Sequence, residues 1–198
     1  MRSRYGCVVV LIDVINRFDF EGSGGLIRAA KRAAPRIERL ARTARRLDVP
    51  VVYVNDNFGR WSSDFNATVN EAAGPDSPGR AVAERLRPAP GDYFVLKPQH
   101  SGFYATPLHL LLDHLQARTL VLAGFATNLC VLFTANDAHM HGYHVVVPSD
   151  CVAANTPALS RGALAHVRTA LAGVTPAVAA LDLAAFARRR KKPRGQAF

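Results

Sequence analysis

The feature that most constrains the fold is a regular alternation of short apolar runs with segments of helical periodicity. The apolar runs are rich in valine, isoleucine and leucine, and their unbroken apolar character is typical of strands that are covered on both faces. They predict six strands, at residues 5–12, 49–54, 92–96, 119–124, 143–148 and 175–181. Helices are expected between them, at residues 35–47, 80–86, 107–116, 128–141 and 157–172. Strands joined through helices predict a three-layer α/β/α domain with a doubly wound, mainly parallel six-stranded sheet.

Two of the connecting segments have distinct local signals. Pro35 suits the first position of the helix at residues 35–47, where its missing N–H costs nothing. Residues 55–78 form a long polar loop that nevertheless contains bulky aromatic side chains. Loops of this length in compact domains are commonly functional, so this loop is a candidate for shaping a binding site.

The size of the chain, 198 residues, fits one domain, which we place at residues 1–186. Residues 187–198 form a basic tail that we expect to be mobile. The stretch RRRKKPR at 188–194 holds six of the 25 basic residues, so the rest of the chain carries +4 of the formal net charge of +10. Aromatic residues do not interleave with these charges, as single-strand binding would favour. A nucleic acid partner is therefore not expected.

Hydropathy and cysteine content indicate the compartment. No apolar run approaches the roughly 20 residues of a membrane-spanning helix, and the apolar start of the chain stops at Asp13, too early for a secretory signal. The three cysteines, Cys7, Cys130 and Cys151, have neither a disulfide framework nor zinc-finger spacing. This pattern favours a reducing cytoplasm and no membrane partner.

Chemically versatile residues follow three of the predicted strands. Asp13 closes the first strand, Lys97 closes the strand at 92–96, and Cys130 follows the strand at 119–124 by one short turn. Ligands of open parallel sheets bind beyond the carboxyl ends of the strands. We therefore expect these side chains to meet in one crevice. Taken singly, Asp13 could cap the next segment, Lys97 could pair with a surface acid, and Cys130 could fill the core.

Together, such residues can support nucleophilic catalysis. Thr127 or Asn128 could cap a helix whose first turn holds Cys130, and this position, with the Lys97 ammonium, would lower the pKa of the thiol. Asp13 could take the thiol proton and later give it to a leaving amine, while Lys97 holds its carboxylate ionised. Backbone N–H groups of the turn at 126–130 could stabilise an oxyanion.

Five longer motifs contain these residues or flank them: VLIDVINRFDF, PVVYVNDNFG, VLKPQHSGFYATPLHLLL, LVLAGFATNLCV and GYHVVVPSDCVA. With them the sequence, over about residues 5–186, resembles the isochorismatase-like cysteine hydrolases, the superfamily of nicotinamidases and N-carbamoylsarcosine amidase. The resemblance implies Cys130 as nucleophile, Asp13 as acid/base and Lys97 as third member of a triad. It also implies a cis peptide between Phe125 and Ala126 that aims the N–H of Ala126, beside that of Cys130, at the oxyanion. Family members are commonly dimers or tetramers, so a homo-oligomer is expected.

The sequence departs from the family pattern at two places, and these departures bear on whether the site binds a metal. Ile15 and Arg17 stand where the usual first motif has Gln and Asp. The loop after the second strand contains Asp56 but lacks the two histidines with which nicotinamidases complete a metal site. Zinc prefers nitrogen and sulfur ligands, so neither a metal nor another cofactor is expected.

The substrate pocket is predicted around the same strand ends, because a mainly apolar cleft with a few polar groups is the usual small-molecule site. His100, close to Lys97, could line the crevice, whereas His139, His141 and His144 are best explained as a solvated helix end. The candidates for the pocket wall are Asn16, Phe18, Asn57, Phe58, Trp61, Phe103 and Tyr104. The alternative for the aromatic residues is an ordinary core or a subunit interface, and for Phe18 this alternative is equally favoured.

The favoured function is a metal-independent cysteine hydrolase that cleaves a C–N bond of a small molecule through an acyl-thioenzyme. Amide, carbamoyl and imide-like bonds are all compatible with the residues. One alternative is the non-covalent hydrolysis of an enol ether, as isochorismatases perform, although those enzymes lack the nucleophilic cysteine. Another is a binding protein that uses the fold as a scaffold and the basic tail as its contact.

Overall fold

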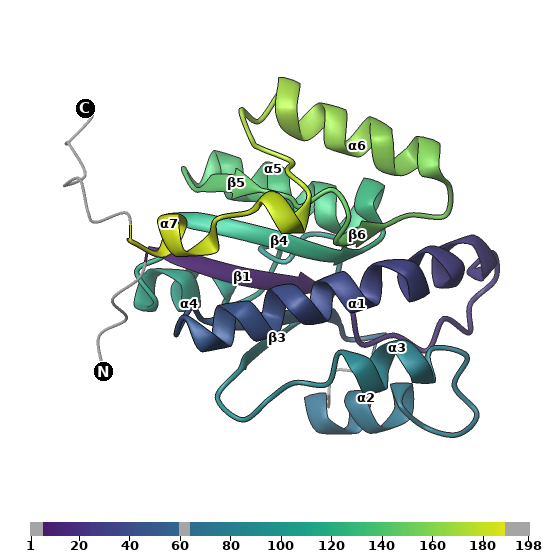
Figure 1. Cartoon of the computed structure of the whole chain (residues 1–198). Coiled ribbons are helices and arrows are strands. Elements are labelled where there is room, and N and C mark those ends of the chain that lie inside the picture. Colours follow the sequence, from purple (N-terminus) through teal and green to yellow (C-terminus); the bar gives the residue numbers. More distant parts are fainter. Residues whose placement is uncertain (1–5, 60–63, 189–198) are drawn as a thin grey trace.

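The computed structural model describes residues 6–59 and 64–188 and has a central six-stranded sheet (Figure 1). The strand order is β3-β2-β1-β4-β5, with β6 paired to β4, and all these pairings are parallel. The strands are β1 (Cys7–Ile12), β2 (Val51–Asp56), β3 (Tyr93–Lys97), β4 (Thr119–Phe125), β5 (His144–Val146) and β6 (Val152–Ala153). The predicted doubly wound sheet is confirmed.

Helices cover both faces of the sheet, as predicted for a three-layer domain. One buried cluster joins the sheet to α1, α2, α3 and α7, and a second joins it to α4, α5 and α6. Two short helical turns, the π-helical η1 and the 3₁₀-helical η2, complete the order. The bounds are α1 (Gly24–Arg46), α2 (Phe65–Ala72), α3 (Arg80–Arg85), α4 (Leu108–His114), η1 (Thr127–Val131), α5 (Leu132–Met140), α6 (Pro157–Thr169), η2 (Val178–Ala180) and α7 (Leu183–Arg188).

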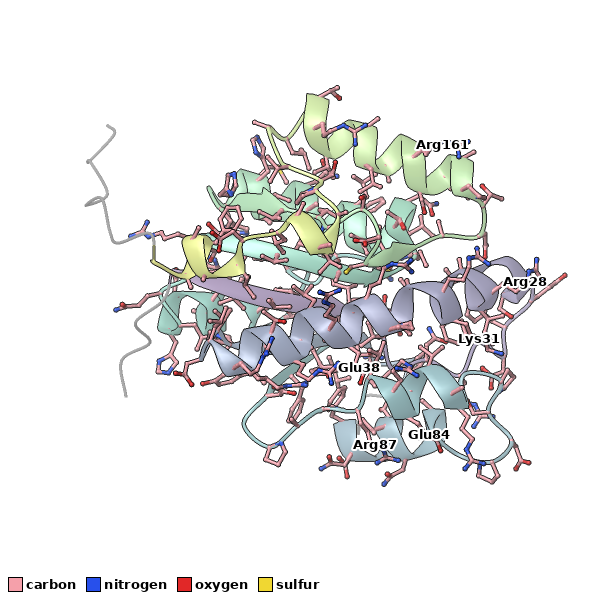
Figure 2. The ribbon with its side chains drawn as sticks, viewed as in Figure 1. Arg28, Lys31, Glu38, Glu84, Arg87 and Arg161 are labelled. Atoms are coloured by element: carbon pink, nitrogen blue, oxygen red, sulfur yellow. The ribbon has the colours of Figure 1, made fainter. Side chains whose placement is uncertain are left out.

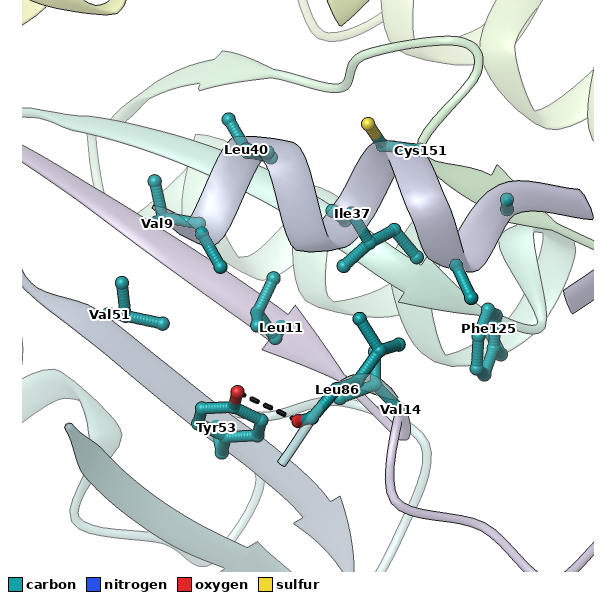
Figure 3. Packing of buried hydrophobic residues seen from close by; sticks show 14 of the residues in the cluster. Val9, Leu11, Val14, Ile37, Leu40, Val51, Tyr53, Leu86, Phe125 and Cys151 are labelled. Carbon is teal, nitrogen blue, oxygen red and sulfur yellow. Dashed lines mark hydrogen bonds between the residues drawn. The ribbon is translucent and has the colours of Figure 1, made fainter. Parts of the chain in front are cut away.

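Strand β1 shows why an unbroken apolar run forms the centre of this sheet. All its residues are buried, and alternate side chains enter opposite clusters: Val9 and Leu11 pack toward α1, and Val8 toward α4 and α5. In Figure 3, Ile37 and Leu40 of α1 lie over this face of the sheet. A strand between two helical layers needs apolar side chains on both faces, which the sequence supplies.

Helix α1 is longer than predicted, because it begins at Gly24 and Pro35 lies inside it. Proline removes one backbone donor from a helix interior. Here the apolar face of the helix already runs from Leu26 to Ala44 against the sheet, and this packing stabilises the helix through the proline. Charged side chains such as Arg28 and Lys31 lie on its outer side (Figure 2).

The predicted sixth strand at 175–181 is wrong. The sixth strand is Val152–Ala153, and residues 175–181 contain the turn η2. The carboxylate of Asp150 accepts the N–H of Val178 at 2.8 Å, and only Val174 forms a bridge to the sheet in this region. Backbone bonds therefore hold this segment as far as Pro176, whose carbonyl accepts the Ser149 N–H at 2.9 Å, and the side chain of Asp150 holds the residues that follow.

The loop predicted at 55–78 contains a helix, α2, whose first turn is capped by Asp64. The Asp64 Oδ1 atom accepts the N–H of Asn66 at 2.8 Å. Trp61 lies outside the described residues, and so does the basic tail beyond Arg188, the last residue of α7. No helix within residues 6–59 and 64–188 combines the length and apolar character that crossing a membrane requires.

Parallel register brings the carboxyl ends of the central strands together. Ile12 lies opposite Val54 in β2 and Gly124 in β4, and Asp56 lies opposite Lys97 in β3. The residues that follow β1, end β3 and follow β4 therefore emerge at one edge of the sheet, which is where the candidate site lies.

Candidate active site

Asp13 is held at the end of β1 by backbone and side-chain contacts. Its backbone leaves the strand in the left-handed region, with φ 52°, while its N–H donates to the Val54 carbonyl at 2.9 Å. One carboxylate oxygen accepts the N–H of Asp56 at 2.8 Å, and the other lies 3.0 Å from the Lys97 Nζ atom. The carboxylate is therefore buried with both oxygens in contact with donors.

Lys97 connects the residues of the site. Its side chain is 0% exposed, and its Nζ atom lies 3.0 Å from Asp13 Oδ2, 3.5 Å from Asp56 Oδ2 and 3.6 Å from the Cys130 sulfur. A buried ammonium is costly unless it is paired and hydrogen-bonded. Lys97 thus joins the carboxylates that follow β1 and end β2 to the thiol that follows β4, as the strand-end prediction requires.

Cys130 lies in η1, the π-helical turn between β4 and α5, and is 8% exposed. The chain enters this turn through Gly124, where φ is +131° and a Cβ atom would lie 2.0 Å from the Ile12 carbonyl oxygen. Ala126 then adopts a left-handed conformation with φ 53° and ψ 68°. The close approach of β4 to β1 thus requires a glycine at position 124.

The predicted cis peptide between Phe125 and Ala126 is wrong, because all peptide bonds of the described residues are trans. The left-handed Ala126 reverses the chain in its place. The predicted cap by Thr127 or Asn128 is also wrong: Ala126 occupies the cap position, and no described side chain caps η1. The Thr127 hydroxyl is instead paired with the Ser160 hydroxyl at 3.1 Å.

The electrostatics of the resting site differ from the prediction of a lowered thiol pKa. Burial raises the pKa of Cys130 to about 12, the Asp13 carboxylate adds to this rise, and the Lys97 ammonium opposes it. Burial also raises the pKa of Asp13, against the effect of Lys97. Burial lowers the pKa of Lys97, but the charges of Asp13, Cys130 and Asp56 outweigh it and raise that pKa. Cys130 is therefore a protonated thiol beside a carboxylate.

Two polar residues that sequence reasoning missed support the site. Asn55 is buried; its amide accepts the N–H of Ile15 at 3.2 Å and donates to the Ile15 carbonyl at 2.7 Å, which fixes the loop after Asp13. The Thr134 hydroxyl donates to the Cys130 carbonyl at 2.7 Å and accepts the N–H of Gly102 at 2.9 Å. A polar residue inside an apolar strand or on a buried helix face was the available signal.

His100 is exposed and lies beside the thiol. Its Nδ1 atom is 3.9 Å from the Cys130 sulfur, and its ring packs against Phe133 with centroids 5.5 Å apart. His100 thus lies beside the thiol, and its place in the wall of a substrate crevice stays a prediction.

The asparagines predicted for the pocket wall shape the loops beside the triad. Asn16 Oδ1 accepts the N–H of Phe18 at 2.7 Å. Asn57 Oδ1 accepts the N–H of Gly59 at 2.9 Å, and the Asn57 N–H donates to the Lys97 carbonyl at 3.0 Å. These contacts form local turns at the ends of β1 and β2.

The predicted aromatic wall is only partly near the site. Phe58 is half-exposed and lines a pocket of about 160 Å³ with side chains that include Ile15, Arg17 and Glu71. Phe18, in contrast, is buried against Phe125 at 5.7 Å between centroids, so it belongs to the core.

Phe103 and Tyr104 do not join the triad either. Phe103 stacks on His141 just beyond the end of α5, about 16 Å along the helix from Cys130 at 1.5 Å per residue. The two residues were predicted to share a wall because they follow Lys97 closely in sequence, but this segment runs away from the thiol. Tyr104 is exposed.

Metal-binding groups were also sought. Across residues 6–59 and 64–188, no three histidine, cysteine, aspartate or glutamate side chains are placed to hold a metal ion together. Asp56 faces the Lys97 ammonium and accepts the Phe58 N–H at 2.6 Å. The ring of His141 stacks on His109 with centroids 4.4 Å apart, so these histidines form a ring pair.

Comparison with known proteins identifies the class. The doubly wound sheet with polar residues at its carboxyl edge is that of a family of hydrolases. Residues 7–178 match the model of the Isochorismatase domain, so the chain belongs to the isochorismatase family. The resemblance predicted from the sequence motifs is confirmed.

Individual relatives include amide-cleaving enzymes. The chain is 38% identical over 148 residues to the uncharacterized isochorismatase family protein YaaI of Bacillus subtilis, covering 75% of this chain and 81% of YaaI. It is 31% identical over 212 residues to ureidoacrylate amidohydrolase RutB of Methylorubrum extorquens, covering 90% and 80%. The crystal structure of N-carbamoylsarcosine amidase from Thermoplasma acidophilum superposes with a TM-score of 0.69 and 28% identity, covering 89% of this chain and 98% of that one. The protein is thus an isochorismatase-family hydrolase related to amidohydrolases.

Proposed function

We propose that the protein is a metal-independent cysteine hydrolase that opens a C–N bond of a small amide or carbamoyl compound through an acyl-thioenzyme. The observation that carries the proposal is the fully buried Lys97 ammonium, 3.0 Å from the Asp13 carboxylate and 3.6 Å from the Cys130 sulfur. A structural thiol has no need of a paired carboxylate and ammonium buried beside it.

The first half of the reaction forms the thioester. The thiol proton moves from Cys130 to Asp13 while the sulfur attacks the carbonyl carbon and the carbonyl electron pair moves onto oxygen. The N–H groups of Ala126 and Cys130, in the turn after β4, are the proposed donors to that oxyanion. Lys97 balances the negative charge that Asp13 and the sulfur share. The C–N bond then breaks, and the amine leaves with a proton.

The second half regenerates the thiol. Water attacks the thioester carbonyl, the C–S bond breaks, and the sulfur regains a proton as the acid leaves. Both halves need a proton donor and acceptor within hydrogen-bond reach of the reacting atoms. The buried Asp13 meets this need at the sulfur.

The substrate class rests on the relatives. RutB is named for ureidoacrylate and the Thermoplasma enzyme for N-carbamoylsarcosine, both of which contain a carbamoyl group. Small carbamoyl amines are therefore the first compounds to test, followed by simple amides such as nicotinamide. We place the reaction in the cytoplasm, where the buried free thiols of the described chain stay reduced.

The test measures ammonia release from ureidoacrylate, N-carbamoylsarcosine and nicotinamide by the wild type and the Cys130→Ala variant. We expect the variant to lose activity by at least about 1,000-fold, as the removal of a nucleophile does. Cys151→Ala, which removes another buried thiol, is the matched control and should keep activity within about 2-fold.

The rival function, non-covalent enol-ether hydrolysis, makes the opposite prediction. Isochorismate would then be turned over by the wild type, and Cys130→Ala would retain most of that activity. Such a result would exclude the acyl-thioenzyme.

A further inference from the structure

Asp13 and His100 both lie next to the Cys130 thiol, and of the two Asp13 is buried and His100 is exposed. Asp13 lies inside, buried, with its carboxylate in contact with Lys97 and with the N–H of Asp56. His100 lies outside, exposed, with Nδ1 3.9 Å from the sulfur. A carboxylate and an imidazole can each carry a proton, so the sulfur has one buried and one exposed proton carrier beside it.

The position of Asp13 suits exchange of a proton with the sulfur itself. One of its oxygens is bound to a backbone N–H at 2.8 Å and the other to Lys97 at 3.0 Å, so the carboxylate is fixed on the inner side. A substrate reaches the thiol from the solvent side. Of the two proton carriers, the exposed His100 is therefore the one that leaving atoms and entering water can reach from solvent.

The segment that carries His100 is anchored to α5, the helix that directly follows the turn with the thiol. The Ser101 hydroxyl is hydrogen-bonded to the Asp137 carboxylate. The Gly102 N–H donates to Thr134, whose hydroxyl donates in turn to the Cys130 carbonyl. The Thr134 hydroxyl thus links the backbone of Gly102, near His100, to the backbone of Cys130. This link fixes the distance between the His100 segment and the thiol.

We propose that His100 is a second acid/base of the reaction: it protonates the leaving nitrogen and later accepts a proton from the attacking water. This inference rests on the proposed function and deepens it. It departs from the expectation that Asp13 carries the proton to the amine. Asp13 instead exchanges a proton with the sulfur, and His100 exchanges protons with the leaving nitrogen and with the oxygen of the attacking water.

The protons and bonds balance over the cycle. The Cys130 proton passes to Asp13 as the S–C bond forms, and the His100 imidazolium gives its proton to nitrogen as the C–N bond breaks. The neutral imidazole then takes a proton from water as the new C–O bond forms. Finally the C–S bond breaks and Asp13 returns its proton to the sulfur, so both groups regain their starting states.

The geometry allows these transfers. In the tetrahedral intermediate the nitrogen is bonded to the same carbon as the sulfur, and His100 Nδ1 lies 3.9 Å from that sulfur. The nitrogen can therefore come within the roughly 2.6–3.2 Å over which a general acid acts. Phe133, packed against the ring, limits its rotation away from this position.

The test uses two probes with the same acetyl group and the same ring. 4-Nitrophenolate leaves from 4-nitrophenyl acetate without a proton, whereas 4-nitroaniline must be protonated to leave from 4-nitroacetanilide. In His100→Gln and His100→Asn we expect the acylation burst with the ester to stay within about 2-fold of wild type, while acylation by the anilide falls about 100-fold. Steady-state turnover of the ester should fall similarly, because water attack loses its base. His139→Gln, an exposed histidine on α5, is the control and should change neither rate.

Other outcomes overturn the inference. Equal losses with both probes would mean that His100 only supports the thiol, and unchanged anilide acylation would mean that Asp13 protonates the amine. A full burst in Cys130→Ala, or no burst in the wild type, would instead contradict the proposed function on which the inference rests.

Discussion

Two buried thiols of this protein have nearly the same electrostatic surroundings and, in our account, different roles. The pKa of both Cys130 and Cys151 is raised to about 12, mainly by burial; in each case a neighbouring carboxylate contributes to the rise and a cation opposes it. At Cys151 the carboxylate is Asp150, 4.0 Å from the sulfur, and the cation is Arg36. The pKa of a thiol therefore does not by itself distinguish a nucleophile from a core residue.

The difference lies in what the neighbours are free to do. Asp150 is held by the Val178 N–H at 2.8 Å and by Arg36 at 3.5 Å, so it fastens η2 and α1. Cys151 is 0% exposed, and its side chain belongs to the buried cluster beside α1 (Figure 3). Cys130 is 8% exposed at the carboxyl edge of the sheet, beside an ammonium that contacts both the sulfur and its proton acceptor. Position and access make the distinction.

The largest expected effect comes from the carboxylates. Asp13→Asn keeps the shape of the side chain but cannot take the thiol proton, so kcat/KM should fall about 1,000-fold. Asp150→Asn should change it by no more than about 2-fold. Steady-state ammonia release measures both, and comparable losses in the two variants would remove the contrast between the two thiols.

The cations should differ in stability. Lys97→Met leaves Asp13 buried without its partner, and we expect the free energy of unfolding at neutral pH to fall by about 3–5 kcal/mol. Arg36→Met, at a side chain that is half-exposed, should cost no more than about 1 kcal/mol. Urea denaturation gives both values. The loss in Lys97→Met should shrink as the pH falls, because protonation removes the unpaired charge of Asp13, whose pKa burial raises.

The thiols should contribute equally to alkaline unfolding. Both have a folded pKa of about 12 against an ordinary value of 9.0, so the unfolded chain loses these protons first. Their stabilisation is complete below pH 9 and is lost as the pH rises toward 12, by up to about 1.4 kcal/mol per pH unit for each thiol. Cys130→Ala and Cys151→Ala should flatten this slope alike. If Cys130→Ala left the pH dependence of the free energy of unfolding unchanged while Cys151→Ala flattened it, the Cys130 thiol would ionise more easily than its burial indicates.

The smallest effect concerns the reactivity of the free thiols. Iodoacetamide at neutral pH should label Cys130 before Cys151, because Cys130 is partly exposed whereas Cys151 is fully buried. Peptide mapping after partial labelling measures the order. Equal labelling would show that access does not separate the two residues.

Much of the fold was predictable because the signals are local and repeated. Unbroken apolar runs gave five strands correctly, and parallel strands bring Asp13, Lys97 and Cys130 to one edge whatever the details of the helices. The errors come from contacts between distant residues. Packing extends α1 through Pro35, and Asp150 fixes the segment after α6.

The sequence predicted which residues meet at the site, but not their hydrogen bonds, backbone conformation or pKa values. The sequence could not show that Thr127 pairs with Ser160, or that the turn rests on a left-handed Ala126. Nor could it show that burial outweighs Lys97 at the thiol, because desolvation depends on the whole enclosure. The expected position of Phe103 failed for a similar reason: closeness in sequence to Lys97 does not determine which way the chain continues.

The most direct test of the account is to trap the covalent intermediate. The wild type is mixed with 4-nitrophenyl acetate, quenched in acid during the burst, and digested for peptide mapping by mass spectrometry. We predict one acetyl group on Cys130, absent from Cys7 and Cys151 and absent in Cys130→Ala. Hydrolysis that proceeds at full rate with no acetyl group on Cys130 would contradict the account.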